Sequence, residues 1–297
     1  MTLLAWFGMK YVPLGGLVGL YFLWRSNWRG RGVFLGLSAL SAIAYAWLHL
    51  EIYGSPTAYN INTVFEGAPT TEVLQAHLEF EGRGYRIWGL FVDQRFGIGR
   101  WAPVLLLILP ALPLLLRRGS LGVLALGLVV AQILIATFVA ITMMGWWFPG
   151  RTLMAVFPLF ALVLTELLIR IPRPARIGVA ALAVYGIVIV IALERATRGG
   201  DVTLAVDPFD MPPEVFQASA RLFPNYQSWS TETIVRTVAW VSAGLTLMAV
   251  LVWCEFQPLQ RINSSDRLSA MPLFRRFRSQ QAVAPSSIEP IAEHRSN

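Results

Sequence analysis

The chain has 297 residues, of which 56% are hydrophobic and only 14% are charged, and its formal net charge is +7. A soluble globular domain is far less apolar, so the composition predicts a single integral membrane domain. A basic chain can bind nucleic acid. Here, however, the arginines are spread over connectors and the tail instead of forming one face with interleaved aromatic residues, and we expect no nucleic-acid partner.

Long apolar runs dominate the sequence, and most have the roughly 17–25 residues that a helix needs to cross a bilayer. They predict an all-α, polytopic transmembrane bundle with about seven crossings. The runs are Leu3–Trp24, Val33–Leu50, Trp101–Leu116, Leu121–Phe148, Leu153–Ile169, Ile177–Leu193 and Thr233–Phe256.

Arginine falls on alternate connectors between these runs. Cytoplasmic loops are enriched in Lys and Arg, so the arginine-bearing connectors and the C-terminus are predicted to be cytoplasmic, in an inner (plasma) membrane. The two long loops, at about 51–100 and 194–232, then lie outside. The arginines in question are Arg25, Arg29, Arg31, Arg117, Arg118, Arg170, Arg173, Arg176 and several in the tail.

The transmembrane domain is predicted to cover residues 1–256. Beyond it, residues 257–297 lose apolar periodicity and read as a disordered, basic cytoplasmic tail. Within the long loops, short helices are predicted near 72–81, at Tyr85–Val92 and at Glu214–Arg221. The first run has no basic leader before it. A chain that starts on the outer side is one alternative, and missing upstream crossings are the other. Because flanking charge normally sets orientation early, we expect further crossings upstream.

Cysteine and histidine give no sign of a metal or cofactor site. Cys254 is the single cysteine, and the three histidines have no metal-ligand spacing. Glu79 and Glu81 lie two apart on a predicted helix and do not face each other, so they favour solvated loop charges over a shared metal site.

Arg151 is the first candidate binding residue. It follows a Pro-Gly break and begins a new apolar run, where a guanidinium beside free backbone amides suits a phosphate or diphosphate. The alternative is that Arg151 extends to lipid headgroups next to an aromatic belt.

Asp93, Arg95 and Arg100 form a second candidate cluster that could hold a polar substrate or a phosphate. A solvated ion pair at a loop end is the alternative there.

Two stretches carry a resemblance to a known family. The first is Tyr53–Thr57, followed later by Gly89–Ile98, which runs into Trp101–Leu106, and the second is Gly150–Leu159. The first is similar to the GSP loop, and then the entry into a crossing, of glycosyltransferases of the GT-C superfamily, which include polyprenyl- and dolichyl-phosphate-sugar mannosyltransferase relatives. The second is similar to the start of a later helix in these enzymes, with Thr152 where the family usually has tyrosine.

The resemblance implies that this chain is the C-terminal portion of an enzyme that moves a sugar from a polyprenyl-phosphate carrier to an acceptor on the outer face. It implies that Arg151 contacts the carrier phosphate, whereas no segment matches the loop that bears the family's catalytic acid. The expected partners are a lipid-linked sugar-phosphate donor and membrane lipids. The alternatives are a non-catalytic lipid or solute transporter and an assembly subunit.

Overall fold

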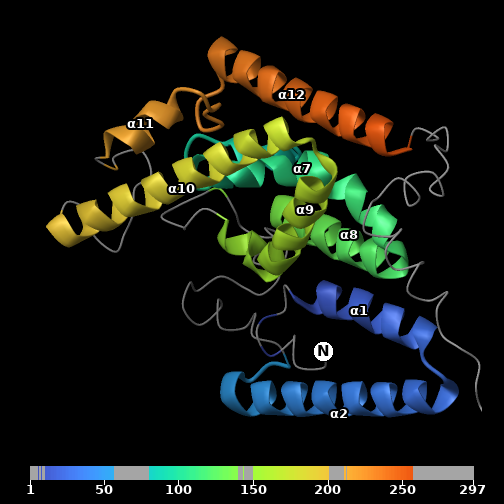
Figure 1. The fold of residues 1–297 in the computed structure, drawn as a ribbon. Coiled ribbons are helices and arrows are strands. Elements are labelled where there is room, and N and C mark those ends of the chain that lie inside the picture. Colours follow the sequence, from blue (N-terminus) through green and yellow to red (C-terminus); the bar gives the residue numbers. More distant parts are fainter. Residues whose placement is uncertain are drawn as a thin grey trace, which may run out of the picture. The chain divides into compact units, whose positions relative to one another are not determined.

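A computed structural model describes residues 11–56, 80–139, 150–200 and 213–256, together with Trp6, Gly8, Met143 and Met211. All regular elements in these ranges are helices, which confirms the predicted all-α class (Figure 1). The chain divides into compact units at 1–252 and 253–297, and the second is described only as far as residue 256. The predicted tail and the helix predicted near 72–81 fall outside the described residues, apart from Phe80 and Glu81.

Five helical stretches are long and apolar enough to cross a membrane, so the described chain has the make-up of a multi-pass membrane protein. The helix α1 (Val12–Arg25) is also apolar but has only 14 residues. Seven crossings therefore remain a prediction. The five stretches are α2 (Trp28–Tyr53), Pro103–Val139, Arg151–Arg170, α10 (Arg173–Gly199) and Thr231–Glu255, which lies within α12 (Thr231–Phe256).

The longest stretch is folded back on itself instead of forming one helix. Gly119, at φ 64°, separates η4 (Leu112–Arg118) from α8 (Gly119–Leu134). A Cβ on Gly122 would lie only 1.8 Å from the carbonyl oxygen of Leu115, which is possible only where the two segments pack face to face. This reversal agrees with the prediction of two separate apolar runs here.

The first of these two runs is not a regular α-helix. It consists of η3 (Pro103–Leu107), α7 (Ile108–Ala111) and η4, with only α7 in the α conformation. Proline lacks a backbone N–H and clashes with the preceding turn, so Pro103, Pro110 and Pro113 divide the run into short pieces. After α8 the chain continues as a π-helical turn, η5 (Ile135–Val139).

The arginine-bearing connectors meet at one end of the bundle, which we call the arginine end. The buried Glu166 carboxylate, on α9 (Phe157–Arg170), forms ion pairs with Arg118 and Arg170. The hydroxyl of Tyr21, in the last turns of α1, lies 3.1 Å from that of Ser120. These contacts place three of the predicted cytoplasmic connectors together, as the alternation of charge requires. Which side of a membrane they face stays a prediction.

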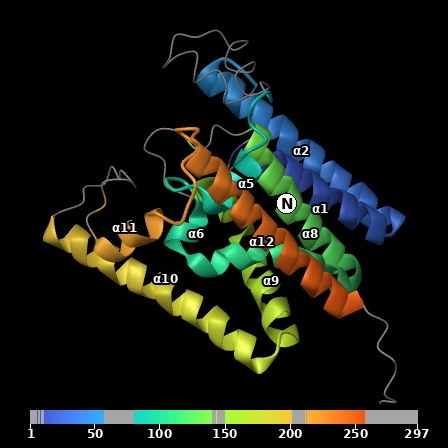
Figure 2. The same ribbon diagram turned by 90° about the horizontal axis from the view of Figure 1, so that it is seen from above.

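Contacts between helices order the rest of the bundle. α1 lies between α2 and α8, and α9 packs against α7 and η4 (Figure 2). The loops carry the short helices α5 (Arg86–Val92), α6 (Ile98–Trp101) and α11 (Glu214–Ala220). Of these, α5 and α11 confirm the short helices predicted at Tyr85–Val92 and Glu214–Arg221. α5 is buried on its C-terminal half and thereby joins the loop to the core.

We predict that Glu166→Ala destabilises the fold by about 2 kcal/mol. The loss is smaller than for a fully buried pair, because the Arg118 side chain is 50% exposed and therefore partly screened. The measurement is thermal unfolding in detergent. Glu194→Ala is the matched control, since it removes another i,i+4 glutamate–arginine pair whose side chains are 54% and 79% exposed. Equal unfolding midpoints for the two variants would contradict the prediction.

Candidate functional site

A buried carboxylate joins two loops at the end of the bundle opposite the arginine end. Asp93 Oδ1 accepts hydrogen bonds from the backbone N–H groups of Arg95 (2.8 Å) and Phe96 (2.6 Å). Its Oδ2 accepts from the N–H of Tyr226 at 3.2 Å, across 133 residues of sequence. Beside it, the N–H of Gln94 donates to the carbonyl oxygen of Pro224 at 2.7 Å. We call this set of contacts the Asp93 junction.

Arg100 is enclosed next to the Asp93 junction. Its Nη1 donates to the carbonyl oxygen of Gln94 at 2.7 Å, and its Nη2 donates to that of Phe216 at 3.2 Å. The guanidinium carbon lies 3.7 Å from the centre of the Phe216 ring, a close cation–π contact. Burial lowers the pKa of Arg100 to about 10, so the side chain is still charged at neutral pH. Arg100 thus ties α11 to the loop that follows α5.

These contacts give Asp93 and Arg100 structural roles in the fold. Their side chains are 1% and 0% exposed, so neither presents a surface to a ligand in this conformation. Burial raises the pKa of Asp93, while the hydrogen bonds from Phe96, Tyr226 and Arg95 oppose that shift. Contact of these two residues with a substrate stays a prediction. In the structure each of them satisfies backbone groups that would otherwise be buried without partners.

Arg95 and Arg151 are the more accessible members of the predicted set. Arg95 is half-buried and donates through Nη1 to Gln227 Oε1 at 3.1 Å. Arg151 is exposed and is the first residue of η6 (Arg151–Val156). The preceding Gly150 packs closely on the start of α6, since a Cβ there would lie 2.6 Å from Ile98 Cγ2. The two arginines therefore belong to segments that meet at the junction end.

The loop before α12 is fixed to the first turns of that helix. Trp240 Nε1 donates to the carbonyl oxygen of Leu222 at 2.8 Å, and Arg236 Nη1 donates to that of Phe223 at 3.1 Å. The rings of Phe223 and Trp240 stack with centres 5.2 Å apart and planes 3° apart. Because the same loop supplies Tyr226 to the Asp93 junction, the junction also positions the N-terminal part of α12.

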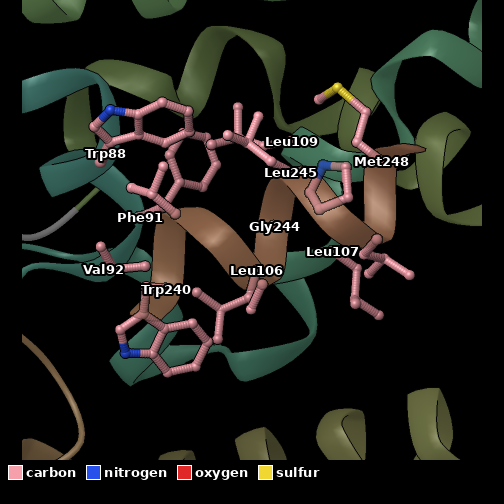
Figure 3. A pocket seen from close by; sticks show the side chains of 14 residues that line it. Trp88, Phe91, Val92, Leu106, Leu107, Leu109, Trp240, Gly244, Leu245 and Met248 are labelled. Atoms are coloured by element: carbon pink, nitrogen blue, oxygen red, sulfur yellow. The ribbon is translucent and has the colours of Figure 1, made fainter. Parts of the chain in front are cut away.

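An apolar groove lies between α12 and the pieces around α7. Its volume is about 140 Å³, and all fourteen residues that line it are apolar or aromatic (Figure 3). Three come from α5, four from the segment around α7 and seven from α12. The lining residues are Trp88, Phe91, Val92, Leu106, Leu107, Leu109, Pro110, Trp240, Val241, Ala243, Gly244, Leu245, Leu247 and Met248.

The groove begins directly beside the Asp93 junction, because Phe91 and Val92 are the last residues of α5 before Asp93. On the opposite wall, five of the seven lining residues of α12, among them Trp240, Gly244 and Met248, are half-buried, and the other two are exposed. None of the membrane-length window of α12 is fully buried. The face of α12 that should pack on the core therefore borders open apolar space.

Among the described residues, no group of three or more His, Cys, Asp or Glu side chains is placed to hold a metal ion. Comparison with family models, with characterised proteins and with solved structures finds no match to this chain. The class of the protein therefore follows from its fold and its groove alone. It is an all-helical protein with several membrane-length helices and an apolar groove between them.

The residues that line the groove cannot be read from the sequence, because its walls come from three distant segments. Two signals were available: helix-breaking prolines, among them Pro110, which indicate kinked helices around a cavity, and the apolar residues of the short helix predicted at Tyr85–Val92. In the structure Pro110 lines the groove, and Phe91 in that helix is 1% exposed. Nothing in the apolar run at Thr233–Phe256 distinguishes the residues that line the groove from those that face away, since both sets are hydrophobic.

We predict that Asp93→Ala lowers the free energy of unfolding by about 2–4 kcal/mol, because three buried backbone N–H groups lose their acceptor. Asp93→Asn should cost less, since its amide oxygen still accepts from Arg95 and Phe96 and only the Tyr226 bond is lost. Denaturant or thermal unfolding in detergent measures both. If Asp93→Ala were as stable as the wild type, the junction would not hold these loops together.

Proposed function

We propose that this protein binds a lipid-linked phosphate, with part of the hydrocarbon chain in the apolar groove and the phosphate at the junction end. The observation that carries the proposal is the groove itself. It lies between helices of membrane-spanning length, and its lining offers no hydrogen-bonding side chain apart from the two indoles. An apolar cavity of this kind excludes water and favours hydrocarbon.

Size and chemistry select the occupant. A dry apolar cavity of about 150 Å³ holds one benzene-sized group, so a groove of about 140 Å³ holds a short stretch of hydrocarbon chain. A transmembrane helix is about 10 Å across and is far too thick. An extended peptide would leave its backbone polar groups without partners among these side chains. The hydrocarbon chain of a membrane lipid is thin enough to fit and has no polar groups that would be left without partners.

The charged end of the ligand is assigned to Arg151 and, more weakly, to Arg95. Arg151 is exposed at the start of its span, and its segment packs against the loop that carries Arg95. A guanidinium binds phosphate oxygens through two parallel hydrogen bonds, which is stronger and more directional than a single contact. Asp93 and Arg100 do not contact the ligand in this proposal, because their side chains are enclosed.

The proposed role in catalysis is sugar transfer from a polyprenyl-phosphate donor, following the resemblance of Gly89–Ile98 and Gly150–Leu159 to GT-C glycosyltransferases. In such a transfer, a carboxylate takes the proton of the acceptor hydroxyl and the leaving phosphate is stabilised by positive charge. Arg151 would supply that charge. No residue is assigned as the base.

Filling the groove tests lipid binding. In Val241→Trp a large ring enters the groove, so we expect photo-labelling by a diazirine-bearing polyprenyl phosphate in nanodiscs to fall about tenfold or more. Val238→Trp is the matched control. It makes the same change on the same helix, but Val238 is 58% exposed and does not line the groove. Unchanged labelling of Val241→Trp, in protein that unfolds at the wild-type temperature, would refute the proposed binding site.

A second variant tests the phosphate contact. We expect Arg151→Ala to weaken binding of polyprenyl phosphate by about tenfold, which corresponds to about 1.4 kcal/mol, while binding of the uncharged polyprenol changes little. Arg151→Lys should restore only part of the affinity, because an ammonium cannot form the paired bonds. Native mass spectrometry or competition with the photoprobe measures each affinity. Equal loss for the phosphate and the alcohol would contradict this role of Arg151.

A further inference from the structure

Gly244 leaves a gap in the wall of the groove. It lies in the middle of α12, four residues after Trp240 and four before Met248, so the three occupy one face of the helix. All three line the groove, with the glycine between the two large side chains (Figure 3). The absence of a side chain at Gly244 therefore leaves a small recess in this wall, between Trp240 and Met248, which we call the notch.

Close packing does not explain a glycine at this position. Glycine in a helix interior costs about 1 kcal/mol relative to alanine, and in membrane helices it usually lets a second backbone approach. At Gly244, however, a Cβ would meet no atom within 4 Å. Its backbone conformation is helical and does not require glycine. What the glycine provides here is space inside the groove.

The side chains next to the notch are held in place. The Trp240 indole is fixed by its hydrogen bond to Leu222 and by stacking on Phe223. Phe91, on the opposite wall, is 1% exposed within the main apolar core. Because these rings cannot readily move apart, the width of the groove near Gly244 depends on the size of the side chain at that position.

We infer that Gly244 determines which hydrocarbon chains the groove admits, and that its notch accepts the methyl branches of an isoprenoid chain. This inference rests on the proposed lipid binding. A straight alkyl chain is uniformly thin and can pass a filled notch, whereas a methyl branch at that point needs the space. One methyl-sized misfit in an apolar pocket changes affinity by about 10- to 200-fold.

The test compares two probes on the 297-residue chain in nanodiscs. The first is a polyprenyl phosphate and the second is a straight-chain alkyl phosphate of similar length. Gly244→Leu is expected to weaken binding of the polyprenyl phosphate by about tenfold or more. The same variant should weaken binding of the alkyl phosphate by less than about threefold. Gly244→Ala should also weaken binding of the polyprenyl phosphate, but by less than Gly244→Leu does. Gly127→Leu is the matched control, because Gly127 is also a half-buried helical glycine with no atom within 4 Å of a Cβ, and it does not line the groove.

The outcomes separate this inference from the proposed function. If the wild-type protein binds neither phosphate, the proposed lipid binding fails. If it binds both and Gly244→Leu leaves both affinities unchanged, or lowers both equally, lipid binding stands and the role of Gly244 is refuted. Both substitutions replace glycine by a better helix former, so thermal unfolding midpoints at or above the wild-type value are expected for both variants.

Discussion

The buried Asp93 carboxylate is the constraint on which the rest of this end of the molecule depends. Three backbone N–H groups from two distant loops share its two oxygens, and a buried N–H without an acceptor is costly. One of these loops continues into α6 and Arg100, and the other holds Trp240 at the start of α12. The Asp93 carboxylate thus holds the loop that packs on the N-terminal part of α12, the helix that forms one wall of the groove.

At both ends of the bundle, buried charged side chains have ion-pair or hydrogen-bond partners within the protein. Glu166 joins Arg118 and Arg170 at the arginine end, and Asp93 and Arg100 are satisfied by backbone groups at the other. Of these groups Glu166, Asp93 and Arg100 are buried, whereas Arg118 stays half exposed. The groove is lined by apolar and aromatic side chains, and Arg151, an exposed residue, lies on a segment that reaches the junction end. This separation of polar and apolar contacts suits an amphipathic ligand such as a lipid phosphate.

The groove also explains why α12 is so weakly buried. A helix that has to pack on a core normally covers its apolar face, yet the residues of α12 that line the groove are half-buried or exposed. Hydrocarbon in the groove would complete that packing, because an apolar chain gains the contacts that its walls now lack. Gly244 enlarges the space where Trp240 and Met248 would otherwise close it.

The sequence by itself determined the helical class, the short loop helices at α5 and α11, and the grouping of the arginine connectors. Apolar length and charge alternation are local or periodic properties that need no knowledge of contacts. The tertiary structure alone decided that Asp93 and Arg100 are enclosed and that Phe91, Leu109 and Gly244 face one another across a groove. Burial and proximity depend on which distant segments meet, and along an apolar run every side chain is hydrophobic whether it faces the groove or the lipid.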